Sequence, residues 1–370
     1  MIDNKYITYF FDGTGSNLNS KQEIEIGKSV VGELYEFNKS NSLVINSQGV
    51  ILKENKEYRC VKIYFPGPGA DPGEYDGIPY PTPGRSNFDS LFLNGYKSYY
   101  VNTLNKLFGN GWEHNEAKAL SCAAQLSYSK KDNHIIIGYS RGAITAISFS
   151  KKLSKLRPGN RIFLFLIDPV AGSDYSKIKN HPNFRDHFIR NNKINPFKIG
   201  ENVYHAKIFY ACNEKRILFK PQLPLLDNIQ YYDRPLYFSK NTEAEIYFMY
   251  ADHRQIAYRY YKNMGINHGA GHKVYNQIAH CINKIPFYCS DNSNFIFYNE
   301  VNLKTDSIYQ YQDRYTDKDR ISKLSNRIIA NEVSRKEKWV TKKYAPGELF
   351  RLSNLLNSKN FNVMSCLKCI

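Results

Sequence analysis

The sequence lacks any run of roughly 18 to 20 uninterrupted apolar residues, the length that a membrane-spanning helix requires. Its mean hydropathy is negative, at −0.54. The first five residues lead directly into an apolar segment at residues 6–11, which leaves no room for the basic, apolar and small-residue parts of a signal peptide. We therefore expect no transmembrane segment and no signal peptide. The expected location is the cytoplasm of the producing cell, unless a specialised secretion system exports the protein.

The sequence contains few cysteines, and their number is odd. Seven cysteines, spread from Cys60 to Cys369, give no even disulfide framework, which favours a reduced compartment. Cys366 and Cys369 alone have the Cys-x-x-Cys spacing. A metal-binding or redox role for that pair is the minor alternative.

Acidic residues are also in deficit. The chain has 34 of them against 51 lysines and arginines, which gives a formal net charge of +17. Such a charge attracts anionic membranes, nucleic acids or acidic proteins, but it does not select among them. Because the sequence carries no nucleic-acid-binding motif, we expect no nucleic-acid partner.

Short apolar runs rich in β-branched and aromatic residues alternate with longer segments of helical character. This alternation predicts an α/β protein with a mostly parallel sheet and helices on both faces. The helical segments are residues 116–129 and 143–156. The expected strands are residues 6–11, 58–65, 134–137, 161–167, 203–210 and 245–250.

The length of 370 residues fits one large domain with additions. We expect a catalytic domain at residues 1–290, followed by a basic, helical extension at residues 291–370. Three segments have the composition of insertions, the last of them resembling a lid or cap. They lie near residues 18–55, 66–85 and 219–241.

The strongest local signal is Gly138-Tyr-Ser140-Arg-Gly142, placed after an apolar strand and before a helix. In the α/β-hydrolase fold a Gly-x-Ser-x-Gly turn of this kind presents a nucleophilic serine above the sheet edge. The backbone N–H of Arg141, at the start of the helix, would then face a developing oxyanion. The motif predicts an α/β-hydrolase with Ser140 as its nucleophile.

A serine nucleophile needs a base, and the base needs an orienting acid, in the chain order Ser, Asp or Glu, His. Asp168 ends the apolar strand at residues 161–167 and is the first choice for the acid, with Glu214 as its rival. His253 follows the last expected strand and is the first choice for the base. His268 is the main alternative base, and His272 remains open.

A second oxyanion donor in this fold comes from a loop after another strand. The sequence Asp12-Gly-Thr-Gly15 follows residues 6–11, so the backbone N–H of Gly13 or Thr14 is the candidate. A plain Asp-Gly turn is the simpler interpretation of that loop. The histidines near residue 270 lack a nearby carboxylate or cysteine ligand pattern, so we predict no metal and no cofactor.

Three segments together resemble the DUF2235 family, which includes phospholipase effectors of the type VI secretion system. They are Phe-Phe-Asp12-Gly-Thr14, Gly138-Tyr-Ser-Arg-Gly-Ala143 and Asp168-Pro-Val. Residues 204–216 are similar to a further stretch of that family. The family's histidine motif is here split between residues 248–253 and residues 268–271.

The resemblance implies an α/β-hydrolase with a Ser-Asp-His triad and phospholipase A-type activity. By motif, the nucleophile falls on Ser140 and the acid on Asp168. The expected function is therefore a lipase or phospholipase acting on a lipid or other ester substrate, with peripheral contact to an anionic membrane. The effector resemblance adds a secretion-apparatus or immunity partner. The alternative is a catalytically inactive hydrolase-fold module that binds or targets a host through its basic carboxyl-terminal region.

Overall fold

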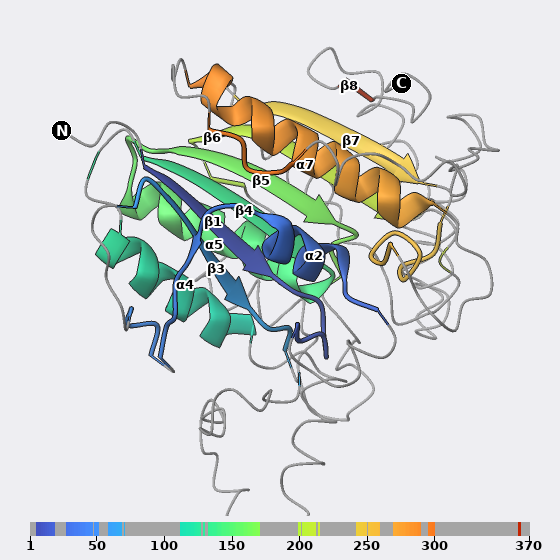
Figure 1. The fold of residues 1–370 in the computed structure, drawn as a ribbon, viewed down its shortest axis with the longest axis horizontal. Helices are drawn as coiled ribbons and strands as arrows, with labels where there is room; N and C mark the ends of the chain where they lie inside the picture. Colours follow the sequence, from blue (N-terminus) through green and yellow to red (C-terminus); the bar gives the residue numbers. More distant parts are fainter. Residues whose placement is uncertain are drawn as a thin grey trace, which may run out of the picture.

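The computed structural model describes sixteen parts of the chain, and every structural statement below concerns these residues. They are residues 5–18, 27–46, 48–51, 58–68, 70, 112–126, 129, 132–170, 199–200, 202–211, 214, 242–249, 251–259, 269–289, 295–299 and 362–363. Within them the chain forms an α/β structure, with one eight-stranded sheet between two layers of helices (Figure 1).

All paired strands of the sheet are parallel, as the sequence predicted. Their order is β2-β3-β1-β4-β5-β6-β7-β8. The six long strands match the six expected apolar runs, with some ends shifted by one or two residues. The strands are β1 (Tyr6–Phe11), β2 (Asn41–Ser42), β3 (Cys60–Phe65), β4 (Asn133–Tyr139), β5 (Arg161–Ile167), β6 (Val203–Ala211), β7 (Glu243–Met249) and β8 (Asn362–Val363).

The strand order reverses beside β1. After β1 the chain forms β2 and β3 on one side of that strand, and then β4 on its other side. In open parallel sheets, ligands bind outside the carboxyl ends of the strands at such a reversal. The loop after β1, which contains Asp12, and the turn after β4, which contains Ser140, meet at this point.

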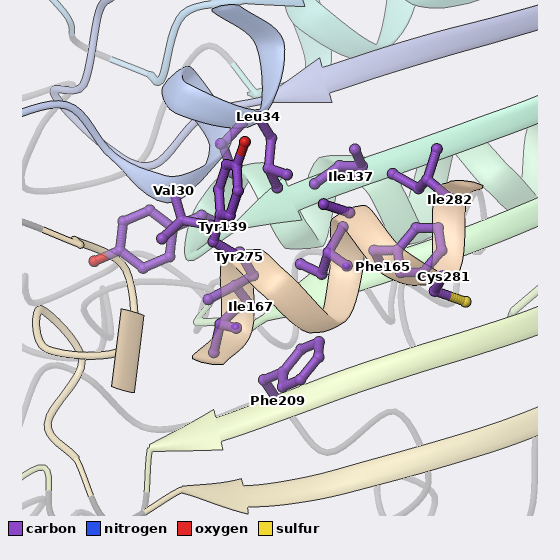
Figure 2. Packing of buried hydrophobic residues seen from close by; sticks show 14 of the residues in the cluster. Val30, Leu34, Ile137, Tyr139, Phe165, Ile167, Phe209, Tyr275, Cys281 and Ile282 are labelled. Carbon is purple, nitrogen blue, oxygen red and sulfur yellow. The ribbon is translucent and has the colours of Figure 1, made fainter. Parts of the chain in front are cut away.

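Helices cover both faces, as expected from strands that are buried on both sides. Helices α4 (Trp112–Leu126) and α5 (Arg141–Leu156) lie on one face, and α2 (Val30–Phe37) and α7 (Ala270–Tyr288) lie on the other (Figure 1). Alternate side chains of each strand enter one of the two cores. The second of these cores lies between the sheet and the helices α2 and α7. Figure 2 shows it, with side chains of α2 and α7 packed against those of β4, β5 and β6.

Part of the segment expected as an insertion belongs to the core. Helix α2 lies within residues 18–55, and its Val30, Val31 and Leu34 are fully buried. The Ser29 side chain caps this helix by accepting a hydrogen bond from the backbone N–H of Gly32 at 2.9 Å. Of the other two expected insertions, residues 69, 71–85 and 219–241 lie outside the described part of the chain.

The described residues of the expected carboxyl-terminal extension also contact the core. Tyr298 is fully buried, and its hydroxyl donates to the backbone carbonyl of Leu34 at 3.0 Å. Strand β8 pairs with β7 at the sheet edge. Apart from residues 295–299 and 362–363, the expected helical extension lies outside the described residues. Among the described helices, none combines the length and the apolar character needed to span a membrane.

Replacing Phe165 tests the second core. The side chain is fully buried in β5 among residues of α7 (Figure 2), so Phe165→Ala should lower the free energy of unfolding by about 3–5 kcal/mol. Urea denaturation followed by circular dichroism measures the change. Val44→Ala, at a position that is 58% exposed, is the control and should change it by no more than about 0.5 kcal/mol. A loss below about 1 kcal/mol for Phe165→Ala would contradict the described packing.

Candidate active site

The candidate site lies at the carboxyl edge of the sheet. Ser140 follows β4, Asp168 follows β5, and His253 lies in the segment after β7. Parallel strands end at the same edge, so the side chains that follow β4 and β5 lie together. The segment after β7 reaches back to them, although Ser140 and His253 are 113 positions apart in the chain. The three positions are those expected from the sequence.

Ser140 occupies a strained turn. Its backbone angles are φ 55° and ψ −120°, a conformation that costs a non-glycine residue on the order of 1–3 kcal/mol. A Cβ atom at Gly142 would lie 2.2 Å from the carbonyl oxygen of Phe11, and one at Gly138 would lie 2.6 Å from Cα of Ala143. Both glycines of the motif therefore allow a close approach of backbone that any side chain would prevent.

The hydroxyl of Ser140 does not cap the helix that it precedes. A serine at this position usually accepts a hydrogen bond from an N–H of the first turn, but the Ser140 side chain makes no such bond in α5. Instead, its Oγ lies 3.0 Å from Nε2 of His253. The turn thus directs the hydroxyl away from its own helix and toward the imidazole.

The imidazole of His253 lies between the hydroxyl and a carboxylate. Its Nδ1 is 2.6 Å from Oδ2 of Asp168, on the side of the ring opposite the Ser140 contact. The exposed fractions are 6% for Ser140, 2% for His253 and 0% for Asp168. A buried carboxylate favours the tautomer in which Nδ1 carries the proton, which leaves the Nε2 lone pair directed at Oγ.

The two carboxylates that the sequence offered for the acid have different contacts. Asp168, whose φ is 37°, also accepts a hydrogen bond at Oδ1 from the backbone N–H of Ala211 at 3.1 Å. Glu214 accepts the backbone N–H of His253 at 3.1 Å. The hydroxyl of Tyr139 donates to the carbonyl of His253 at 3.1 Å. Asp168 therefore contacts the imidazole, whereas Glu214 and Tyr139 hold the backbone that carries it.

The alternative histidines are not placed at Ser140 by any described contact. His268 lies outside the described residues. His272 is buried in the first turn of α7, where its Nδ1 accepts a hydrogen bond from Nε of Arg259 at 3.4 Å.

Asp12 organises the loop after β1. Its buried carboxylate accepts hydrogen bonds from the backbone N–H of Gly13, the hydroxyl of Ser29 and the hydroxyl of Tyr64, each at 2.7 Å. Burial raises the pKa of this carboxyl, and the three donors oppose that effect. The Gly13 N–H donates to Asp12, so of the two oxyanion donors expected in this loop only the Thr14 amide remains a candidate. The anchoring role of Asp12 was not expected from the sequence, although its position directly after a strand could have suggested it.

The loop after β1 also contacts the nucleophile turn directly. Nη1 of Arg141 donates to Oγ1 of Thr14 at 3.1 Å. The Arg141 side chain therefore joins the two segments whose backbone amides are the candidate oxyanion donors.

No protein-family profile and no curated protein matches the chain. Several solved structures are similar to it, among them the following two. One is an uncharacterized protein from Pseudomonas aeruginosa, 15% identical, with a TM-score of 0.44 over 91% of this chain. The other is the Tle1 effector bound to the VgrG spike of the type VI secretion system, 14% identical, with a TM-score of 0.36 over 71% of this chain. The chain spans about half the length of each, 51% and 52%. A likeness of this degree shows neither a shared family nor a shared activity.

A buried contact between an arginine and a glutamate anchors the segment that carries His253. Nε of Arg259 lies 3.4 Å from Oε2 of Glu33 in α2, and the Arg259 guanidinium lies 4.3 Å from the ring centroid of Tyr275 in α7. Burial raises the pKa of Glu33 to about 7, against the opposing effect of Arg259. The folded protein therefore holds a proton on Glu33 at pH values where the unfolded chain has released it.

This shift predicts a pH-dependent stability. The contribution of Glu33 is fully present below its unfolded pKa, about 4.5, and is lost as the pH rises through its folded pKa, about 7. Glutamine does not titrate, so the free energy of unfolding of Glu33→Gln should rise relative to wild type by about 1–3 kcal/mol between pH 5 and pH 7.5. Urea denaturation at both pH values measures the difference. A difference between the two proteins that stays constant with pH would contradict the assignment.

Proposed function

We propose that the chain is a serine hydrolase of the α/β-hydrolase fold that cleaves carboxylic esters, with Ser140 as nucleophile, His253 as base and Asp168 as orienting acid. The observation that carries the proposal is the line of contacts from Ser140 Oγ through the imidazole to Asp168, at 3.0 Å and 2.6 Å. Both distances lie in the hydrogen-bonding range that a general base needs to remove a proton. The strained turn at Ser140 supports it further, since such strain gathers at functional positions.

In the proposed reaction, Nε2 of His253 takes the proton of Ser140 as Oγ attacks the ester carbonyl carbon. The imidazolium that forms is stabilised by the carboxylate of Asp168. The tetrahedral intermediate collapses by breaking the bond to the leaving alcohol, whose oxygen receives the proton from Nε2. The acyl group remains on Ser140 until water, activated by the same imidazole, releases it as a carboxylic acid.

The backbone amides of Arg141 and Thr14 are the proposed donors to the oxyanion. Arg141 is the first residue of α5, and the N–H groups at the amino terminus of a helix form a favourable environment for an anion. The hydrogen bond from the Arg141 guanidinium to the Thr14 hydroxyl fixes the separation of the two segments. Donors held in position before the reaction stabilise the developing charge without a cost of reorganisation.

The proposed substrate is the acyl ester of a phospholipid. The motifs at Asp12, Ser140 and Asp168 resemble those of phospholipase effectors, and the net charge of +17 favours an anionic lipid surface. The same resemblance extends the proposal to export by a type VI secretion system, with a secretion-apparatus partner and a cognate immunity protein.

Removing the Ser140 hydroxyl tests the nucleophile. Ser140→Ala should lower fatty-acid release from phosphatidylglycerol vesicles by at least about 10³-fold and should abolish labelling by a fluorophosphonate probe. Ser154→Ala is a matched control, because that hydroxyl lies on the same helix and donates to the carbonyl of Ser150. Equal release or labelling by Ser140→Ala would refute the proposal. Failure of the wild-type protein to react with the probe would favour the inactive binding module.

Two carboxylate variants test the orienting acid. Asp168→Asn should lower kcat by about 10³- to 10⁴-fold, because an amide holds the imidazole in the wrong tautomer. Glu214→Gln keeps an oxygen that can accept the His253 N–H, so it should lower kcat by about 10-fold or less. Hydrolysis of a chromogenic ester measures both. A larger loss for Glu214→Gln than for Asp168→Asn would reverse the assignment of the acid.

A further inference from the structure

A second group of titratable side chains lies near the amino ends of strands β6 and β7, at the opposite end of the strands from the candidate active site. His205 is near the start of β6, and Glu243 and Glu245 are at the start of β7. One potential ligand atom from each of the three residues lies within 4.8 Å of the others. Nδ1 of His205 is 3.5 Å from Oε2 of Glu243, and its Nε2 is 3.4 Å from Oε1 of Glu245.

Strand pairing brings these residues together. His205 is the direct partner of Glu243 in the β6–β7 register, and Lys207 is the partner of Glu245. Residues two apart on a strand share a face, so all four side chains lie on the face that α7 covers. The carboxyl-terminal end of α7 reaches the same place, where the ring of Tyr288 stacks on the imidazole with centroids 6.5 Å apart.

We propose that His205, Glu243 and Glu245 bind a divalent transition-metal cation of the zinc type. Imidazole nitrogen and carboxylate oxygen are ligands that zinc accepts, at about 2.0–2.2 Å. A tetrahedral arrangement with these bond lengths separates its ligand atoms by roughly 3.3–3.6 Å, which matches the contact between His205 and Glu245. The Glu243 side chain is 62% exposed, so the ion can enter from solvent and keep water in the remaining position.

Neighbouring groups orient the Glu245 carboxylate for this role. Its Oε2 accepts hydrogen bonds from the Lys207 ammonium, at 3.0 Å, and from the Tyr247 hydroxyl. Its Oε1 is the oxygen that faces the imidazole. Partners of this kind fix the direction of a ligand and are a regular part of metal sites.

The charge states at this place are those that ligands need. Burial lowers the pKa of His205, which favours the neutral imidazole. Burial raises the pKa of Glu245, but Lys207 and Tyr247 outweigh that effect, and the net shift is downward. Metal ligands must be deprotonated to bind. The carboxyl-terminal end of α7 adds a partial negative charge that favours a cation.

The cation would cross-link β6 and β7 at a distance from the candidate active site. Six residues separate His205 from Ala211, whose N–H contacts Asp168. At about 3.3 Å per residue they span about 20 Å. The ion therefore takes no part in ester cleavage, and the metal proposal stands or falls independently of the proposed function.

A zinc titration tests the proposal in a Cys366→Ser/Cys369→Ser parent, which removes the separate Cys-x-x-Cys pair. The chelator-stripped parent should bind one equivalent of Zn²⁺ in competition with a chromogenic zinc indicator, and its Tm should rise when zinc is added. Glu243→Gln in that parent should weaken zinc binding by at least about 10-fold. Because Glu243 is exposed, this variant should fold normally. Glu36→Gln, at another exposed glutamate, is the matched control and should bind zinc as the parent does.

Three results would overturn the proposal. The first is the absence of one equivalent of bound zinc in the Cys366→Ser/Cys369→Ser parent. The second is equal zinc affinity in the parent and in Glu243→Gln. The third is a Tm of the parent that does not change with zinc. Fluorophosphonate labelling of Ser140 in the same samples reports separately on the proposed hydrolase, so failure of one proposal is distinguished from failure of the other.

Discussion

The strained turn at Ser140 is the constraint on which the candidate site depends. A non-glycine residue with φ 55° is unfavourable in isolation, and it persists here because β4 and α5, the elements on both sides of it, are almost entirely buried. Gly142 then brings the first turn of α5 against the carbonyl oxygens of Phe11 and Asp12, closer than any side chain would permit. One local conformation thus fixes both the direction of the hydroxyl and the position of the loop after β1.

The order of the strands distributes the supporting groups around that turn. The Asp12 loop comes from β1, on one side of β4, and Asp168 comes from β5, on the other. The next strand, β6, supplies the N–H of Ala211 that holds the Asp168 carboxylate. His253 follows β7 and reaches back over two strands, which explains why its backbone is held at both its N–H and its carbonyl, by Glu214 and Tyr139. An imidazole on a long loop needs such contacts to keep a fixed orientation.

Features with a local pattern could be predicted from the sequence, and features created by pairing could not. The apolar runs of β1 and β5 gave their bounds, and the Gly-x-Ser-x-Gly spacing with its strand and helix context identified the turn at Ser140. Helix α2 was missed because its eight residues lie in a long polar segment and only one short face is apolar.

The anchoring role of Glu214 and the group around His205 were missed for another reason. His205 and Glu243 are 38 positions apart, and only the register of β6 with β7 makes them neighbours. The expectation of no metal rested on His268 and His272 and took no account of His205.

Helix α7 extends from the segment that carries His253 to the group around His205. Its 19 residues, at 1.5 Å each, extend about 28 Å. Its amino-terminal part contacts the Arg259 segment that carries His253, and its carboxyl-terminal part reaches His205. Between these ends its buried side chains pack against β5 and β6 (Figure 2). Close-packed interiors resist deformation, so a cation bound at the carboxyl end would stabilise the sheet as a whole while leaving the geometry at Ser140 unchanged. The proposed metal site and the candidate active site thus lie near opposite ends of α7, so substitutions at one are expected to leave the other unchanged.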